Sequence, residues 1–555
     1  MLSRFFSMCL AFAGLAVALP ATAAVPCAGL LTVALESARV TASVPVLGPL
    51  YLAADGNTYT GVPSFCKVTA VATPTPDSLI HIELWLPTAA DWNGRFQGVG
   101  NGGYAGSIAV PAPAMLVALK RQFAVATTDM GTAPSGNNNG DLLVGHPQKW
   151  EDWGHRATHL MTVVSKELIA AYYGRAPAYS YFNGCSTGGQ QALMTAQRYP
   201  NDYDGILAGA PAHNRTHIHT GLVWNFQAQK ATPQSTFNSD HAKLITTAVA
   251  QACNVKSGGL ASDAFLTDPR ACNWDPGALQ CTGATATNCL SPEQVTAARR
   301  IYDGARNPAN GQRIVSASTR GAESDSLFGW QSQGRAEPQF GSLFKWVFGL
   351  TWQAASYDFN EHMASVDALL APMLNANQPD LGAFRARGGR LIAYHGTADP
   401  LIPVQESINH YHRMVQAQPG SWNTALGRTR QFARLFVVPG MAHCAGGAGP
   451  NSFGNLFSGA VLAPESPLVS GTHDAMVALQ NWVEGGTAPD QLVATKYVQD
   501  QPLLGIEAQR PICAYPQFPR YFGRGDPKAA TSFICADNGN SGAALNPLPA
   551  PQYLR

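Results

Sequence analysis

The segment 182–193, FNGCSTGGQQAL, constrains the fold of this chain more than any other segment does. The apolar stretch AYSYFNG leads into it, and TGGQQALMTAQRYP after it has the apolar spacing of a helix. A strand, a G-x-S-x-G turn and a helix in this order expose a serine hydroxyl on a sharp turn, as in the nucleophile elbow of serine hydrolases. The pattern therefore predicts a strand–turn–helix unit with Ser186 as a nucleophile.

Segments on both sides of this turn alternate between strand and helix patterns. The patterns typical of strands are SFCKVTAVATP, LIHIELWLP, QFAVATTDMG and YDGILAGAPA. A helical pattern in HRATHLMTVVSKELIAAYYG ends at Gly174, and the alternation resumes with GGRLIAYHGTADPLIP, ESINHYHRMVQ and FARLFVVPGMAHCAGG. Together with the serine turn, the alternation predicts an α/β-hydrolase fold with a mostly parallel sheet covered by helices.

The pattern changes between residues 213 and 386. This stretch holds four cysteines, many Gly, Asn and Pro residues and a cluster of aromatic side chains. We expect it to be a large lid or substrate-binding domain. It would be inserted into a catalytic domain that residues 24–212 and 387–555 form together.

The first residues have the pattern of a secretory signal peptide. Arg4 precedes an apolar run that Pro20 closes, and the residues ATA at positions 21–23 match a cleavage site. A membrane anchor is the alternative, but the run is too short to span a bilayer comfortably. We therefore expect residues 1–23 to be removed and the protein to be secreted or periplasmic.

Two later segments supply the partners that a serine nucleophile needs. Asp399 follows the predicted strand in GGRLIAYHG, and His443 follows the one in FARLFVVPG. The order Ser, Asp, His is that of α/β-hydrolases, whose sites lie beyond the carboxyl ends of the strands. We predict that His443 takes the proton of Ser186 and that Asp399 orients the imidazole. Glu406 is a weaker alternative to Asp399, and we expect His395 to be structural.

A glycine-rich loop, GVGNGGYAG, follows an early predicted strand. It matches G-x-G-x-x-G, but a dinucleotide site needs a helix to begin at the end of that motif. Here YAGSIAVPAPAM has two prolines and no helical period. We expect an oxyanion hole instead, formed by the backbone N–H of Thr187 and one from Gly102 or Gly103, worth about 3 kcal/mol per donor.

Ten cysteines remain after the signal peptide, an even number that indicates disulfides in an exported protein. Cys185 precedes Ser186 and Cys444 follows His443, so a catalytic triad would bring these two cysteines together. We predict a disulfide between them that clamps the base to the nucleophile. Pairing between neighbours in the sequence predicts four more disulfides: Cys27–Cys66, Cys253–Cys272, Cys281–Cys289 and Cys513–Cys535.

The charge of the chain argues against two classes of partner. The formal net charge is +1, and no run of Lys or Arg is present. Nucleic acids and anionic membranes attract basic patches, so we expect neither as a partner.

The motifs GCSTGG, HGTADPLIP and PGMAHC together resemble the tannase and feruloyl esterase family from about Cys27 to the end of the chain. The resemblance implies an α/β-hydrolase core with a lid, five disulfides in the pairing given above, and hydrolysis of esters of aromatic acids. It also implies a calcium site in a loop after Cys253. Here Asn254 and Ser257 stand where carboxylates are expected, and Asp263 alone remains, so we expect weak calcium binding or none.

We therefore expect a serine carboxylic ester hydrolase that acts on small esters of feruloyl, galloyl or related aromatic acids and requires no cofactor. The alternatives are a mono(2-hydroxyethyl) terephthalate-type monoester hydrolase, a serine peptidase, and a catalytically silent binding protein of the same fold. The lid aromatics would stack on a substrate ring or form ordinary core. Arg335 would pair with a substrate carboxylate or lie solvated at the surface. The candidate substrate-binding residues are Trp330, Arg335, Phe340 and Trp346.

Overall fold

The structure is a computed structural model that describes residues 24–53, 56–283, 288–456 and 468–539. The expected signal peptide, residues 1–23, lies outside this described part. In the described ranges, no helix has the length and apolar character needed to cross a membrane.

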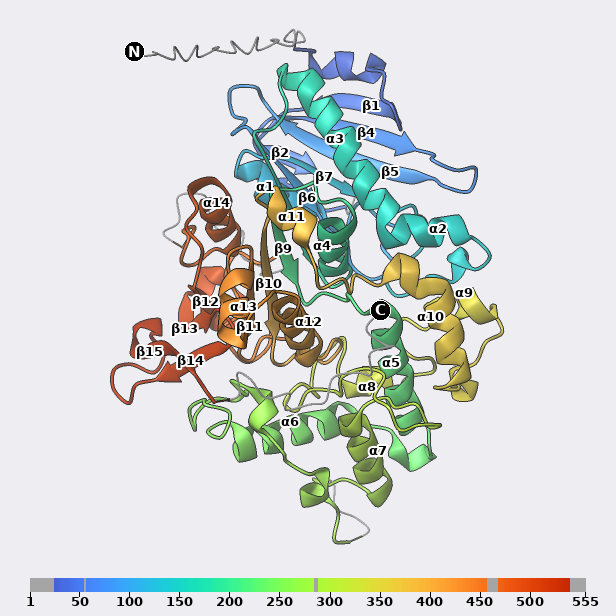
Figure 1. The fold of residues 1–555 in the computed structure, drawn as a ribbon, viewed down its shortest axis with the longest axis vertical. Helices are drawn as coiled ribbons and strands as arrows, with labels where there is room; N and C mark the ends of the chain where they lie inside the picture. Colours follow the sequence, from blue (N-terminus) through green and yellow to red (C-terminus); the bar gives the residue numbers. More distant parts are fainter. Residues whose placement is uncertain (1–23, 54–55, 284–287, 457–467, 540–555) are drawn as a thin grey trace, which may run out of the picture.

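A nine-stranded sheet forms the centre of the molecule, in the order β1-β4-β5-β7-β6-β8-β9-β10-β11 (Figure 1). The strands from β7 to β11 in this order pair in parallel, and β1, β4 and β5 are antiparallel to their neighbours. The mostly parallel sheet of an α/β-hydrolase is therefore confirmed. The strands are β1 (Arg39–Val46), β4 (Phe65–Ala72), β5 (Ile80–Pro87), β6 (Arg95–Val99), β7 (Ala124–Thr128), β8 (Tyr179–Cys185), β9 (Gly205–Gly209), β10 (Arg390–Gly396) and β11 (Ala433–Val438).

Helices cover both faces of this sheet. Successive strand residues point to opposite faces, so Ala124 and Ala126 belong to one buried core and Val125 to the other. The first core packs against α3 (Ala157–Tyr173), α4 (Thr187–Arg198) and α12 (Val404–Gln416). The second packs against α1 (Ala112–Lys120) and α14 (Ala475–Gly485).

Helix α1 begins within YAGSIAVPAPAM, a stretch that has no helical period in its sequence. Pro111 and Pro113 stand at the helix start, where the backbone N–H groups have no acceptor in the helix anyway. The helix begins well beyond Gly103. The glycine-rich loop therefore lacks the helix that a dinucleotide motif requires directly after it.

Most of the segment between β9 and β10 lies below the sheet in Figure 1, and the segment packs in two ways. Its middle part has a core of its own, in which Ile245, Val295 and Trp330 are buried. In its last part, Phe344 and Met363 belong instead to the core that packs against α3, α4 and α12, which is the main core of the molecule. The helices of this segment are α5 (Arg215–Gln229), α6 (Ser239–Cys253), α7 (Pro292–Asp303), α8 (Trp330–Gln333), α9 (Ser342–Phe348), α10 (Glu361–Leu374) and α11 (Gly382–Ala386).

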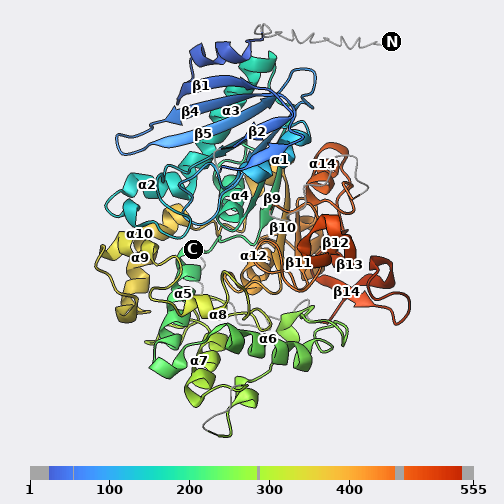
Figure 2. The same ribbon diagram turned by 180° about the vertical axis from the view of Figure 1, so that it is seen from behind.

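Short elements complete the fold at both ends of the sheet. Figure 2 shows the sheet from behind, with the C-terminal strands beside β11. Two hairpins form there, and a smaller one forms near the start of the chain. The remaining elements are β2 (Leu50–Leu52), β3 (Thr58–Thr60), α2 (Pro147–Glu151), α13 (Trp422–Thr429), β12 (Gln491–Tyr497), β13 (Ile506–Cys513), β14 (Gln517–Tyr521) and β15 (Phe533–Asp537).

Candidate active site

Ser186 stands on a strained turn between β8 and α4. Its backbone has φ 65° and ψ −118°, a region that costs a residue with a Cβ about 1–3 kcal/mol. Two hydrogen bonds hold it there: the Ser186 N–H donates to Gly209 O at 3.0 Å, and Ser186 O accepts from Ala212 N–H at 3.1 Å. This is the backbone geometry that projects a nucleophile out of an elbow.

The glycines around Ser186 allow backbones to touch. A Cβ on Gly184 would lie 2.3 Å from Gly188 O, and one on Gly100 would lie 2.6 Å from Gly188 Cα. The Gly188 N–H donates to Asn101 O at 2.7 Å. The elbow therefore packs directly against the loop after β6, which is the loop expected to complete an oxyanion hole.

Asp399 and His443 form a hydrogen-bonded pair at the ends of β10 and β11. His443 Nδ1 lies 2.7 Å from Asp399 Oδ2, and Asp399 Oδ1 accepts the N–H groups of Leu401 at 2.9 Å and Ile402 at 3.0 Å. Burial raises the pKa of the Asp399 carboxyl, but the charge of His443 and hydrogen bonds from His443 and His395 outweigh it, so the net shift is downward. The carboxylate therefore stays ionised at neutral pH and can hold an imidazolium.

His395 supports Asp399 from behind. Its Nε2 lies 3.1 Å from Asp399 Oδ2 and 2.9 Å from Ile402 O, and its Nδ1 lies 2.7 Å from Ser407 Oγ. Because both neighbours of Nε2 are acceptors, the proton is on Nε2 and the ring donates to Asp399. Glu406, the alternative to Asp399, accepts from Asn214 and from the Ser316 N–H instead.

A disulfide joins the serine turn to the histidine loop. Cys185 and Cys444 are bonded across a sequence separation of 259, with their Cα atoms 5.9 Å apart. Both are buried. Because Ser186 and His443 are their immediate neighbours, the bridge holds the serine and the Asp399–His443 pair in one site. The structure also contains the other four expected bridges: Cys27–Cys66, Cys253–Cys272, Cys281–Cys289 and Cys513–Cys535.

Three backbone N–H groups near Ser186 have no hydrogen-bond acceptor within the described residues: those of Gly102, Gly103 and Thr187. Of these residues, Gly103 and Thr187 line the pocket with Ser186. The Thr187 hydroxyl donates to Gly103 O at 2.8 Å and ties the two donors together. A Cβ on Gly103, where φ is +51°, would lie 1.9 Å from Asn137 O, so this position requires glycine. For Gly102, a Cβ would meet open space.

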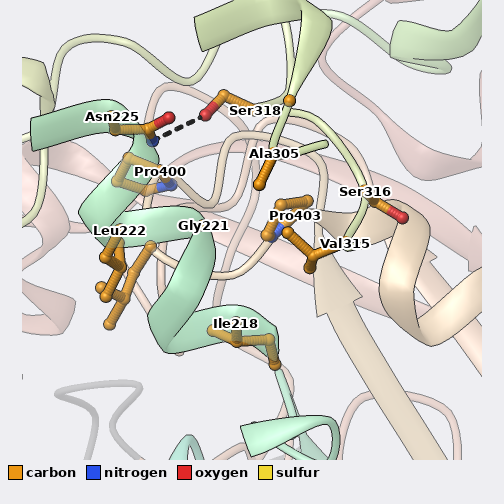
Figure 3. Close-up of a pocket in the computed structure, with 12 residues that line it drawn as sticks. Ile218, Gly221, Leu222, Asn225, Ala305, Val315, Ser316, Ser318, Pro400 and Pro403 are labelled. Atoms are coloured by element: carbon orange, nitrogen blue, oxygen red, sulfur yellow. Dashed lines mark hydrogen bonds between the residues drawn. The ribbon is translucent and has the colours of Figure 1, made fainter. Parts of the chain in front are cut away.

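A small pocket lies beside Ser186. Its wall is mostly apolar, and α5 supplies one side of it. A second pocket continues along α5 and is lined at its far end by Asn225 and Ser318, which share a hydrogen bond of 3.1 Å (Figure 3). Both pockets share three lining residues: Ile218, Leu222 and Leu401.

Of the four predicted substrate-binding residues, only Phe340 lines the pocket with Ser186. Trp330 is fully buried in the separate core, with its ring 5.2 Å from Phe237 and 5.0 Å from Tyr302. Trp346 stacks on Trp150 at 5.8 Å in the main core.

Arg335 lies exposed in the loop after α8 and does not line the pocket. These positions agree better with the two alternatives to substrate binding. The tryptophans lie in ordinary core, and Arg335 lies at the solvated surface. Aromatic composition did not distinguish core from pocket, because side-chain direction depends on packing.

Sequence reasoning missed two polar residues in this pocket. Arg215 and His219 are each 3% exposed and lie one helical turn apart on the face of α5 that lines it. Arg215 and His219 are four positions apart in RTHIH, shortly after the β9 strand pattern. This spacing could have indicated that the two side chains lie on one face of a helix. Burial lowers the pKa of His219 well below its usual value, so the ring is neutral at pH 7.

The loop after Cys253 does not fit a calcium ion. The Asp263 carboxylate is buried and accepts two hydrogen bonds from Arg510, from Nη2 at 2.8 Å and from Nη1 at 3.2 Å. The Asn254 side chain donates to two backbone carbonyls, and the Ser257 hydroxyl donates to Asn254 O. A guanidinium already neutralises the one carboxylate, so a divalent cation would meet a positive charge and too few anionic ligands.

We predict that a chelator leaves the melting temperature unchanged and that Arg510→Met lowers stability by about 3–5 kcal/mol, because it leaves Asp263 buried and unpaired. Thermal unfolding with and without EDTA, and denaturant titration of the variant, measure both effects. Asp263→Asn combined with Arg510→Met should recover part of the loss. Stoichiometric calcium in the purified protein together with a large drop in melting temperature on chelation would contradict this assignment.

The sheet, the serine elbow and the Asp399–His443 pair define an α/β-hydrolase. Residues 66–536 match the family model described as tannase and feruloyl esterase. The chain belongs to the tannase and feruloyl esterase family, and it is a carboxylic ester hydrolase.

Individual relatives cover nearly the whole chain. An esterase of Xanthomonas campestris pv. campestris, itself described as uncharacterized, is 35% identical over 96% of this chain and 94% of its own length. Mono(2-hydroxyethyl) terephthalate hydrolase of Piscinibacter sakaiensis is 32% identical over 86% of this chain and 85% of its own. The crystal structure of feruloyl esterase B from Aspergillus oryzae superposes with a TM-score of 0.82 at 26% identity, covering 92% of this chain and 99% of that one.

Proposed function

We propose that the protein is a secreted serine esterase that hydrolyses esters of aromatic carboxylic acids, of the feruloyl or galloyl kind, through an acyl-enzyme on Ser186. The observation that carries the proposal is the Cys185–Cys444 bridge, which holds a strained serine beside a buried Asp399–His443 pair. The mostly apolar pocket beside the serine supports an aromatic acyl group. Five disulfides support an oxidising, extracytoplasmic location.

The proposed reaction follows from these positions. Ser186 Oγ attacks the ester carbonyl carbon while His443 Nε2 takes its proton, and the carbonyl electron pair moves to the oxygen. The Thr187 and Gly103 N–H groups stabilise that oxyanion. The tetrahedral intermediate collapses, the alcohol leaves with the proton from His443, and an ester to Ser186 remains. Water, activated by the same histidine, then releases the acid.

We also propose that this reaction needs no cofactor, because the nucleophile, the base and the oxyanion donors all come from the chain itself. Apart from water, a small aromatic ester is the only partner that the mechanism requires.

A matched panel tests the substrate class: methyl ferulate, methyl gallate, chlorogenate, mono(2-hydroxyethyl) terephthalate and a peptide anilide. We expect the highest kcat/KM on one or more of the aromatic esters and at least about 100-fold less on the anilide, whose leaving group is poorer. Preference for the anilide would point to a peptidase. No turnover of any ester, combined with no labelling by a fluorophosphonate probe, would point to a silent binding protein.

A further inference from the structure

Arg215 is a buried cation whose surroundings disfavour its positive charge. It is 3% exposed, and no carboxylate in the described part of the chain forms an ion pair with it. Its Nε atom is buried without a hydrogen-bond partner. It is also the first residue of α5, where the helix dipole disfavours a positive charge. Burial lowers the pKa of Arg215 to about 9, which still leaves it charged at pH 7.

The contacts of Arg215 converge on the proposed oxyanion hole. Its Nη2 donates to Thr187 Oγ1 at 3.1 Å, and that hydroxyl donates to Gly103 O. Its guanidinium lies 4.6 Å from the centre of the Trp153 ring, and Trp153 Nε1 donates to the same carbonyl at 3.3 Å. Arg215 is therefore linked to Gly103 in two ways, through the Thr187 hydroxyl and through the Trp153 ring. The Gly103 N–H is one of the two proposed oxyanion donors.

Arg215 is also the one charged side chain among the residues that line the pocket with Ser186. His219 beside it is neutral, and the remaining lining side chains of α5 are apolar. A positive charge in a poorly solvated pocket acts strongly on a negative charge that develops nearby.

We propose that Arg215 is a positioning residue for the oxyanion hole, which aligns Gly103 and Thr187 and supplies the positive potential that stabilises the tetrahedral oxyanion. This inference rests on the proposed function. The oxyanion appears when the electron pair of the ester carbonyl moves to oxygen and disappears when the C–O bond to the alcohol breaks. Arg215 stays protonated throughout, so it lowers the barrier without exchanging a proton.

The test compares Arg215→Met with Arg300→Met on methyl benzoate and monomethyl terephthalate. Arg300 is a matched control, because its guanidinium also lies over a tryptophan, 4.4 Å from the Trp224 ring, but outside the pocket. We expect Arg215→Met to lower kcat about 10- to 100-fold on both esters with KM changed less than about 3-fold, and Arg300→Met to leave kcat unchanged. Arg215→Lys should recover part of kcat, because it keeps the charge without the planar fork.

Thr187→Val and Thr187→Ser keep the inference testable if Arg215→Met does not fold. Valine removes the hydroxyl that links Arg215 to Gly103 and should lower kcat, whereas serine keeps the hydroxyl and should lower kcat much less. Affinity for a benzeneboronic acid, which forms a tetrahedral adduct on serine, should fall with kcat in the Arg215→Met, Arg215→Lys and Thr187→Val variants.

Three results would overturn the inference: an unchanged kcat in Arg215→Met, an equal loss in Arg300→Met, or a loss confined to the ester with a free carboxylate. The last result would make Arg215 a substrate-recognition residue instead. Failure of the proposed function itself would look different, since Ser186→Ala would then keep its activity whatever Arg215 does.

Discussion

Replacing Ser186 by alanine is expected to lower kcat on every ester substrate by about four to six orders of magnitude while the protein stays folded. The hydroxyl is the proposed nucleophile, and an alanine side chain cannot form the covalent intermediate. Asp399→Asn should cost about four orders of magnitude, because an amide at Oδ2 would favour the wrong tautomer of His443. Single-turnover and steady-state kinetics measure these losses.

The effects of these substitutions should not add. A variant that combines Ser186→Ala with His443→Ala should be scarcely less active than the worse of the two single variants, because the residues act as one unit. Ser165→Ala is a control: this serine is fully buried on α3, whereas Ser186 is half-buried, and its hydroxyl has no hydrogen-bond partner among the described residues. Near-normal turnover by Ser186→Ala would refute the mechanism proposed here.

Replacing Cys185 and Cys444 together by alanine is expected to produce the second largest effect, on stability and activity at once. The bridge closes a loop with a sequence separation of 259, and in the chain-entropy model a loop of that length contributes about 5 kcal/mol. The bridge also fixes the distance between the serine turn and the histidine loop. We therefore expect a large drop in melting temperature and at least about a 10-fold loss of kcat.

The Cys281–Cys289 bridge is the control for this variant. It spans a separation of only 8 and contributes about 2.5 kcal/mol in the same model. Its replacement by two alanines should lower the melting temperature less and leave kcat unchanged, because it lies outside the pocket. Peptide mapping without reduction checks the pairing directly. Equal effects of both double variants on kcat would show that the Cys185–Cys444 bridge has no special role at the site.

Much of the site was predictable from sequence because the chain order and local pattern carry it. A strand followed by G-x-S-x-G and a helix imposes the elbow, and Asp399 and His443 each follow a strand of a parallel sheet. The carboxyl ends of parallel strands meet at one edge, so residues far apart in sequence had to converge. Cys185 and Cys444, which have no neighbouring cysteine in the sequence to pair with, were then left as partners of each other.

The segment between β9 and β10 was less predictable, since its side chains face partners that no local pattern specifies. Aromatic residues of similar composition and spacing ended in different places: Phe340 in the pocket, Trp330 in a separate core and Trp346 in the main core. Arg335 is exposed, whereas Arg215 lines the pocket on α5. Periodicity identifies the buried face of a helix, but it does not say whether that face meets core or cavity.

The sequence by itself determined the mostly parallel α/β class of the sheet, the elbow, the positions of Asp399 and His443 and the cysteine pairs, because each depends on local pattern or on chain order. Only the tertiary structure decided the environments of the charged groups. Asp263 meets Arg510 across 247 positions of sequence, and Arg215 lies against Thr187 with no carboxylate beside it in the described ranges. Such pairings depend on how distant segments pack, and the free energy of a buried charge depends on that packing more than on anything adjacent in the chain.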